Sequence, residues 1–338
     1  MRCAMDTQDL TTPEAKRAIS VHPLAGMIVK RVVSGMLTVI AVSLVVFFAM
    51  ELQPGEIGYS ILGSEATPES VAAFRTKLGL DLPATVRYWE WISGFLTGNL
   101  GRSFVSEREI ASLLGSRLAN SFFLAGLAAA IAVPLSLALG MLAALYRKSW
   151  LDHITNVLAL GSLSSPEFFL GYVLIFLFSI QLGWLPSFAQ ISAGLSFAER
   201  AHQSLLPAIT LTLVITGHIM RMTRAAILNV MESPYVEMAV LKGISPARIM
   251  LRHALPNSIA PIFSVLLLNL AYLIVGVVVV EVVFAYPGLG QLLVDSVGKR
   301  DLPLVQAATL IFASTYVALN VLADVLSIVA NPRLLYPK

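Results

Sequence analysis

Long stretches almost free of charged side chains dominate this sequence and restrict the folds open to it. A helix needs about 20 predominantly apolar residues to cross the hydrocarbon core of a bilayer. In lipid the backbone must satisfy its own hydrogen bonds, which favours helices for such stretches. The sequence therefore predicts an all-α polytopic membrane protein with six transmembrane helices, at about residues 31–51, 118–146, 154–182, 204–226, 257–281 and 303–327.

The overall composition agrees with this class. Hydrophobic residues make up 57% of the 338 residues and charged residues 13%, whereas a soluble domain is usually about one-quarter charged. The formal net charge of +3 is small, which argues against a nucleic-acid partner, because nucleic acid requires a dense basic face. The single cysteine, Cys3, excludes an intrachain disulfide.

Lysine and arginine predict the orientation. If the N-terminus is cytoplasmic, most of these residues fall in inside segments, while the two short outside loops carry Arg200, Lys299 and Arg300. This bias follows the positive-inside rule and predicts that both termini are cytoplasmic. Residues 1–26 are expected to form a polar cytoplasmic extension without a secretory signal pattern, and residues 27–338 to form one transmembrane domain.

Two connections between the apolar runs are long. Residues 52–117 are expected to lie outside and to be partly helical, because Thr67-Pro68-Glu69 is typical of a helix start. This outer loop is interpreted either as a lid packed on the rim of the bundle or as a docking surface for an external partner. Residues 227–256 are expected on the cytoplasmic side.

Motifs for catalysis are missing from the sequence. Gly298-Lys299 is followed by Arg300, so the phosphate-binding pattern G-x-x-x-x-G-K-[ST] does not occur. The five histidines are scattered, and neither H-E-x-x-H nor G-x-S-x-G is present. We therefore expect no catalytic residues, no metal site and no ATP hydrolysis by this chain.

A few polar side chains interrupt the apolar runs. Glu167 follows Ser165-Pro166 in the third run, where a lone carboxylate costs a few kcal/mol unless it is paired or wet. It either lines a cavity or meets water at a helix kink. His218, Arg221 and Arg224 close the fourth run; snorkelling towards the cytoplasmic surface is the favoured explanation for the arginines, with substrate contact as the alternative. Glu167, His218 and Arg221 are candidate residues of a translocation path.

The connection from Tyr235 to Asn257 carries several charged side chains between two apolar runs. Val236–Leu241 can form a short helix, and Gly243 allows a turn with positive φ. Ser245-Pro246 can cap and open a second helix, Ala247–Ala254. Such an elbow could insert into a groove of a soluble partner, or it could lie on the lipid headgroups as an amphipathic segment.

The spacing within this elbow resembles the E-A-A-x-x-x-G-x9-I-x-L-P signature of ABC-importer permeases. Five residues match the signature: Glu237, Ala239, Gly243, Leu255 and Pro256. Met238 and His253 stand where the family has alanine and isoleucine. The resemblance implies that the elbow, with Arg248 in its second helix, docks on an ATP-binding subunit and transmits its motion.

Further stretches resemble the oligopeptide/dipeptide and nickel importer permeases, in particular the B-type member of their heterodimer. They follow the order of that family and cover nearly the whole chain from about residue 27: "LGLDLP", "GNLGRSF", "SSPEFFLG", "LGWLP", "RMTRAAILNV", "VVVVEVVFAYPGLGQLLVDSV", "RDLPLVQ" and "NPRLL". The chain departs from the family at Asn99 and Asn331, where aspartate is frequent, and at Pro54-Gly55-Glu56-Ile57, where "PGDP" is frequent.

The "FAYPGLGQ" loop follows Glu281. Pro287, Gly288 and Gly290 supply a tight turn that we expect near the external surface. This loop is interpreted as shaping an external gate, and contact with a solute-binding protein is implied by the resemblance.

The resemblance as a whole implies one permease subunit of an ATP-driven importer in a bacterial inner membrane. The expected partners are a homologous second permease, two ATP-binding subunits that hold ATP and Mg²⁺, an external solute-binding protein and membrane lipid. The chain itself would bind no cofactor. Peptides are the leading cargo, with nickel, opines, glutathione and sugars as alternatives. The alternative function is a secondary transporter or channel without ATPases, which predicts paired intramembrane charges or repeated discontinuous helices.

Overall fold

The structure is a computed structural model that describes residues 21–52, 66–77, 79, 81–192 and 194–330. Within these ranges the chain is helical and has no sheet, with one isolated bridge between Arg102 and Glu109. The first twenty residues of the predicted extension, the "PGEI" stretch and the "NPRLL" tail lie outside the described residues.

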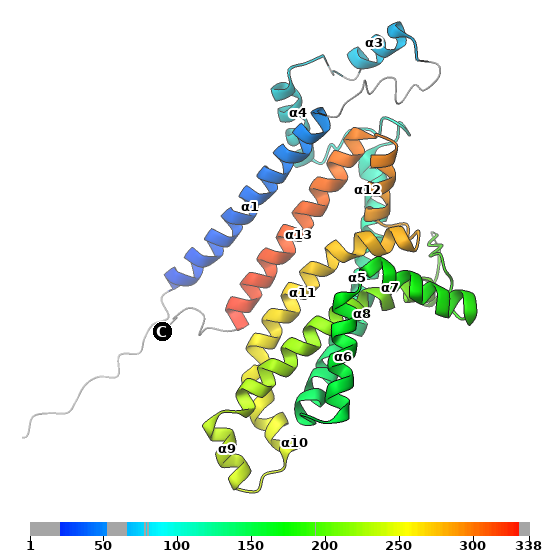
Figure 1. Cartoon of the computed structure of the whole chain (residues 1–338). Coiled ribbons are helices and arrows are strands. Elements are labelled where there is room, and N and C mark those ends of the chain that lie inside the picture. Colours follow the sequence, from blue (N-terminus) through cyan, green and yellow to red (C-terminus); the bar gives the residue numbers. More distant parts are fainter. Residues whose placement is uncertain (1–20, 53–65, 78, 80, 193, 331–338) are drawn as a thin grey trace, which may run out of the picture.

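The elements run through the chain in the order shown in Figure 1. They are α1 (Val21–Glu51), α3 (Pro68–Lys77), α4 (Ala84–Thr97), α5 (Ile110–Leu145), α6 (Trp150–Ser164), α7 (Glu167–Leu174), the π-helical η2 (Ile175–Gln181), α8 (Phe197–Met231), α9 (Pro234–Leu241), α10 (Pro246–Ile249), the π-helical η3 (Met250–Ala254), α11 (Leu255–Val283), α12 (Leu289–Gly298) and α13 (Leu302–Ala330).

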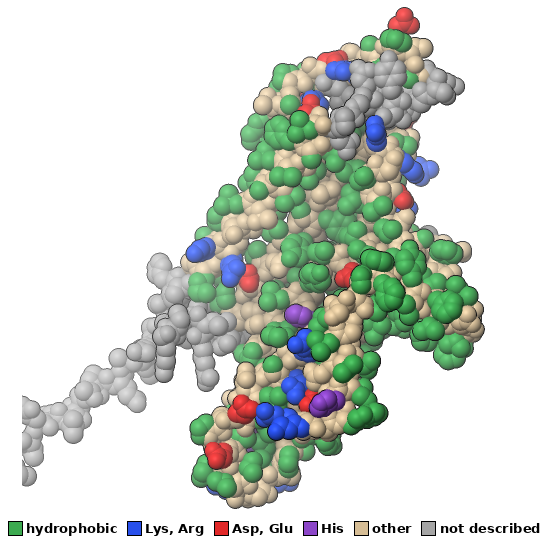
Figure 2. Space-filling view, in the orientation of Figure 1, with side chains coloured by type: hydrophobic (Ala, Val, Ile, Leu, Met, Phe, Trp, Pro, Cys, Tyr) green, Lys and Arg blue, Asp and Glu red, His purple; other side chains and the backbone are tan. Residues whose placement is uncertain are grey.

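The predicted class, an all-α polytopic membrane protein, is confirmed. Within the described ranges, five helical stretches are long and apolar enough to cross a membrane: α1, α5, α8, α10 to α11, and α13. The bent pair α6–α7 is a sixth candidate span. Hydrophobic side chains dominate the face shown in Figure 2, and many Lys and Arg side chains gather towards the α9–α10 end. A surface of this composition suits contact with lipid.

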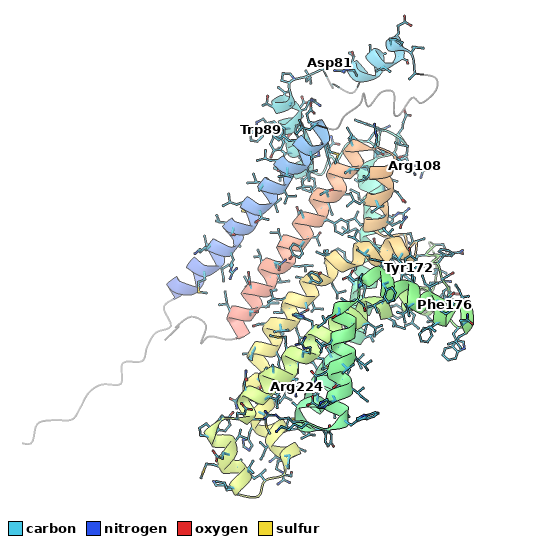
Figure 3. The ribbon with its side chains drawn as sticks, in the orientation of Figure 1. Asp81, Trp89, Arg108, Tyr172, Phe176 and Arg224 are labelled. Atoms are coloured by element: carbon cyan, nitrogen blue, oxygen red, sulfur yellow. The ribbon has the colours of Figure 1, made fainter. Side chains whose placement is uncertain are left out.

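The third apolar run differs from the single span expected at 154–182. It forms two helices, α6 and α7, whose axes are bent by 110°. Pro166 has no N–H to donate, and the residue before a proline disfavours the helical region. Ser165 accordingly has an extended conformation, with φ −95° and ψ 133°, and ends α6. The bend turns α7 aside from the axis of α6. Gly171 and Leu174 of α7 are buried against the bundle, while Tyr172 and Phe176 are exposed (Figures 1 and 3).

The core lies where α5, α8 and α11 meet. The buried face of α5 carries small residues at helical spacing: Ala125, Ala128, Ala132, Ser136 and Gly140. A Cβ on Gly140 would lie 2.8 Å from the Met220 carbonyl oxygen of α8, so a glycine is needed for this close approach. Thr212 of α8 also donates a hydrogen bond to the Ala128 carbonyl oxygen at 3.3 Å. The small-residue face therefore packs within the chain, against α8.

The first and last long helices pack along one another. A Cβ on Gly35 of α1 would lie 2.9 Å from Val317 of α13, which shows how closely the two helices approach. An ion pair joins the same helices, with Arg31 Nη1 3.1 Å from Asp324 Oδ2. α1 and α13 thus form a helix pair at one side of the bundle (Figure 1).

The outer loop folds back onto α1 through α4. The Tyr88 hydroxyl and Ser43 Oγ share a hydrogen bond at 2.9 Å, and the Trp91 ring stacks on Phe47 with centroids 6.0 Å apart. α3 begins at Pro68, as the Thr67-Pro68-Glu69 pattern predicts. The contacts between α4 and α1 fit the interpretation of this loop as a lid on the rim of the bundle.

Candidate functional site

The described residues contain the helix–glycine–helix elbow that the sequence predicts. It consists of α9, a turn at Gly243 and α10. Gly243 has a φ of +75°, a conformation that glycine adopts without a Cβ penalty. Val236 and Ala239 of α9 and Ile249 of α10 are buried against one another. The two short helices therefore share a small apolar core that sets their relative position.

Two details of the elbow differ from the sequence expectation. Ser245 occupies the N-cap position of α10, but its side chain makes no capping hydrogen bond. The second helix also does not end at Ala254, because η3 leads directly into α11. Leu255 and Pro256 therefore lie in the first turn of α11. Pro256 has no N–H to donate. The π-helical segment η3 before it is a local adjustment of the backbone that lets the helix continue past the proline.

The outward face of the elbow combines charged and apolar side chains. Glu237 and Arg248 are exposed. Met238 and Leu241 are also exposed, at 55% and 74%. Exposed apolar groups rimmed by polar ones are typical of surfaces that contact another protein.

An ion pair fixes the elbow end of α8 to α6. Arg224 donates from Nε and Nη2 to the two carboxylate oxygens of Asp152 at 2.7 and 2.8 Å. The Lys148 N–H and the Asn156 side-chain amide donate to the same carboxylate at 3.0 and 2.7 Å. The Arg224 side chain is therefore paired with a carboxylate on a neighbouring helix, a partner that the snorkelling expectation did not include.

We expect Asp152→Ala to lower the free energy of unfolding by about 3 kcal/mol, because it leaves the partly buried Arg224 guanidinium without its counter-charge. Glu232→Ala is the matched control. It removes an exposed ion pair with Arg147 and should cost at most about 1 kcal/mol. Thermal denaturation of the purified variants in one detergent measures the difference. Equal denaturation midpoints for the two variants would contradict the assignment.

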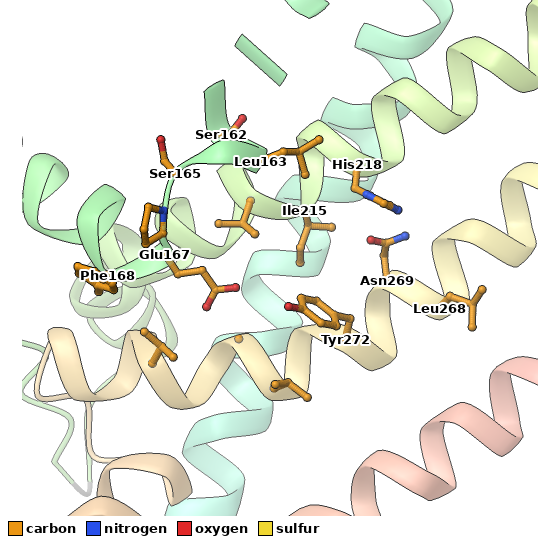
Figure 4. Close-up of a pocket in the computed structure, with 15 residues that line it drawn as sticks. Ser162, Leu163, Ser165, Glu167, Phe168, Ile215, His218, Leu268, Asn269 and Tyr272 are labelled. Carbon is orange, nitrogen blue, oxygen red and sulfur yellow. The ribbon is translucent and has the colours of Figure 1, made fainter. Parts of the chain in front are cut away.

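Two of the three candidate path residues meet in one pocket. The pocket has a volume of about 740 Å³ and lies between the α6–α7 junction, α8 and α11. Glu167 enters it from the first turn of α7 and His218 from α8, beside Asn269 and Tyr272 of α11 (Figure 4). Arg221, further along α8, is exposed and is not among the described residues that line this pocket.

At the end of α11 that lies away from the elbow, Glu281 connects three helices. Its buried carboxylate accepts hydrogen bonds from the N–H groups of Gly290 at 2.6 Å and Gln291 at 3.3 Å, in the first turn of α12. Ser121 of α5 donates to the carboxylate at 2.5 Å and accepts from the Leu289 N–H at 2.8 Å. A helix N-terminus has unpaired N–H groups and partial positive charge. Glu281 therefore caps α12 from another helix.

The glycines of the predicted gate loop are required by close contacts. A Cβ on Gly288 would lie 1.9 Å from Glu281 Oε1, and a Cβ on Gly290 would lie 2.6 Å from the Val278 Cα. The φ of Gly288 is −103°, so lack of space rather than a left-handed backbone explains this glycine. Pro287 joins the same arrangement, because its carbonyl oxygen accepts a hydrogen bond from α5 at 2.8 Å.

Sequence reasoning missed the roles of Glu281, Ser121 and Tyr286. A carboxylate inside an apolar run was a usable signal for Glu281, but nothing local marks Ser121, which lies 160 positions earlier. Tyr286 is buried, and its hydroxyl donates to the Asn120 carbonyl oxygen at 3.0 Å. Burial raises the pKa of the Tyr286 phenol above its ordinary value.

Comparison with known families identifies the class of protein. Residues 136–336 match the family described as "Binding-protein-dependent transport system inner membrane component". The chain belongs to this family. Residues 24–125 match the N-terminal region described for the membrane components of such systems. The two matches together extend over most of the chain.

Individual relatives of this permease are similar over nearly their whole length. A putative peptide transport system permease protein of Brucella abortus (strain 2308) is 37% identical over 313 residues, which cover 93% of this chain and 100% of the relative. A protein of the same description from Brucella suis biovar 1 (strain 1330) has the same identity and coverage. The glutathione transport system permease protein GsiC of Escherichia coli (strain K12) is 35% identical over 309 residues, 91% of this chain and 98% of GsiC.

Membership of the family fixes the role of the chain in coarse terms. It is a multi-pass inner-membrane component of an ABC importer that depends on a binding protein. It is the permease and not the ATPase, so ATP belongs to a partner subunit and the permease itself holds no cofactor. The alternative of a secondary transporter or channel without ATPases has no support from these matches.

Proposed function

We propose that this permease is one of two homologous membrane subunits of an ATP-driven importer of peptides. Relatives named for peptide and for glutathione transport align along more than nine-tenths of the chain, and glutathione is itself a small peptide. The proposed assembly adds a second permease, two ATP-binding subunits and an external solute-binding protein. Both termini and the elbow face the cytoplasm in this arrangement, as the distribution of Lys and Arg predicts.

The continuity of the elbow with two core helices carries the proposed mechanism. α8 ends at Met231, just before α9 begins at Pro234, and η3 joins α10 to α11. A displacement of the elbow therefore moves α8 and α11. These helices carry His218 in the pocket and Glu281 at the gate loop. One rigid motion of the elbow can thus reach both the pocket and the far end of α11.

Each part of the elbow has a proposed role in coupling. Glu237 and Arg248 present charges to the ATP-binding subunit, and Ala239 packs the two short helices together. Gly243 sets the angle between those helices. Leu255 and Pro256 begin the helix that carries the motion onwards. ATP binding closes the two ATPases and tilts the bundle, and the pocket then opens to the binding protein; hydrolysis returns it to the inside.

Uptake by the reconstituted transporter tests this proposal. The chain is co-purified with its ATPases and second permease, placed in proteoliposomes and supplied with binding protein and a radiolabelled peptide. Uptake is expected to require ATP on the side of the elbow. Uptake driven by a proton gradient in the absence of ATP would overturn the proposed function.

A further inference from the structure

The Glu167 carboxylate differs from the other buried or partly buried acids of the bundle. Asp152 is paired with Arg224, and Glu281 caps α12. Among the residues that the structure describes, no group donates a hydrogen bond to Glu167 or forms an ion pair with it. It is half-buried and points into the pocket (Figure 4). An ionisable side chain without a partner inside an apolar segment is a candidate functional residue.

The neighbouring helix leaves space for this carboxylate. A Cβ on Gly276 of α11 would lie 3.2 and 3.4 Å from the two Glu167 oxygens, which is a tight contact. The glycine therefore lets the carboxylate rest against α11. His218, Asn269 and Tyr272 point towards the same space in Figure 4. Polar groups from three helices thus converge on one cavity, as they do in ligand-binding sites.

Glu167 is the one acid among the described residues that line the pocket, and none of these residues is Lys or Arg. The formal charge of the lining is therefore −1 with Glu167 ionised and His218 neutral. The remaining wall is largely apolar and includes the aromatic side chains of Phe168 and Tyr272. Aromatic faces attract cations, and a desolvated carboxylate attracts them more strongly. The volume of about 740 Å³ is within the range of small-molecule sites.

From this arrangement we propose that the pocket binds the ammonium group of a peptide in transit, with Glu167 as the counter-charge. The apolar wall then receives an adjacent side chain of the peptide. This inference rests on the proposed function, since it assigns a chemical group of the cargo to a place on the path. It makes the membrane subunit a second point of selection, which favours substrates with a free, positively charged N-terminus.

Cysteine modification tests the charge and the accessibility of the pocket without requiring transport. Ser165 lines the pocket beside Glu167. Ser165→Cys is introduced into this chain after Cys3→Ser removes its own thiol, and modification of this chain alone is followed in the assembled transporter. The rates of reaction with a cationic and an anionic methanethiosulfonate of similar size are compared. The ratio of the two rates is used because any effect of Glu167 on the intrinsic reactivity of the thiol changes both rates equally and cancels.

We expect Glu167→Gln to lower the cation-to-anion rate ratio on the order of fivefold, because it removes the carboxylate charge from the described lining of the pocket. Glu90→Gln removes an exposed carboxylate on α4 and should leave the ratio unchanged. A thiol that reacts with neither reagent would show that the pocket is closed to water. Such a result, or an unchanged ratio in Glu167→Gln, would overturn the inference.

Protection by a peptide tests the ligand class. Trialanine at millimolar concentration, without binding protein, should slow modification of the Ser165→Cys thiol several-fold, while N-acetyl-trialanine should not. Glu167→Gln should abolish the difference. Equal protection by both peptides, or by neither, would refute binding of the ammonium group. ATP-dependent uptake is measured separately on the same protein, so a failure of the proposed function is distinguished from a failure of this site.

Discussion

Gly288→Ala is expected to disrupt the junction of α11 and α12 and to lower the free energy of unfolding by about 3 kcal/mol or more. The new Cβ would lie 1.9 Å from Oε1 and 2.1 Å from Cδ of Glu281. The carboxylate cannot move aside freely, because it caps α12 and accepts a hydrogen bond from Ser121. Its displacement leaves buried N–H groups unpaired, which adds to the steric cost.

Thermal denaturation in detergent measures this effect, and the same helix provides a control. Gly298 is the last residue of α12, and a Cβ there would meet nothing within 4 Å. Gly298→Ala should therefore leave the denaturation midpoint within a few degrees of the wild-type value. A Gly288→Ala protein as stable as Gly298→Ala would contradict the close contact.

A double-mutant cycle separates the clash with Glu281 from other effects. Glu281→Ala removes the cap and should itself destabilise the protein. Truncation of Glu281 to alanine also removes the carboxylate atoms that obstruct a Cβ at Gly288. Gly288→Ala should therefore lower the free energy of unfolding only slightly when Glu281→Ala is already present. Additive losses in the double mutant would show that the clash with the carboxylate is not the cause.

Gly243→Val is expected to abolish co-purification with the ATP-binding subunits and ATP-driven uptake. Gly243 has a φ of +75°, which a β-branched residue strongly disfavours. The cost is of the order of 1–3 kcal/mol in the folded elbow. The turn would relax to another conformation, and α9 and α10 would lose their relative orientation. The bundle should remain folded, because the elbow lies at its surface.

The controls for Gly243 use the same position. A Cβ at Gly243 would meet nothing within 4 Å, so a substitution acts through the backbone conformation and not through a clash. Asparagine adopts the left-handed region far more readily than valine. Gly243→Asn should therefore retain association and uptake. If Gly243→Val retains association and uptake, the elbow is not the coupling element. If Gly243→Asn loses association and uptake, the left-handed conformation of residue 243 does not explain the effect of valine.

Features with local causes were predictable from the sequence. The apolar runs predicted the membrane helices, and Pro68 marked the start of α3. The spacing of Gly243 and Pro246 predicted the elbow, because glycine and proline act on the backbone at their own positions. The Ser165-Pro166 pair marked the break in the third run, although the 110° bend could not be derived from it.

The sequence by itself thus determined which segments are apolar enough to be buried in lipid and where the backbone must turn. The tertiary structure alone decided which side chains meet across helices. Arg224 donates hydrogen bonds to Asp152, which lies 72 positions away in the sequence. Ser121 donates a hydrogen bond to Glu281, which lies 160 positions away. The physical reason is range: hydrophobicity and turn preferences act within a few residues, whereas the partner of a buried charge depends on how whole helices pack against one another.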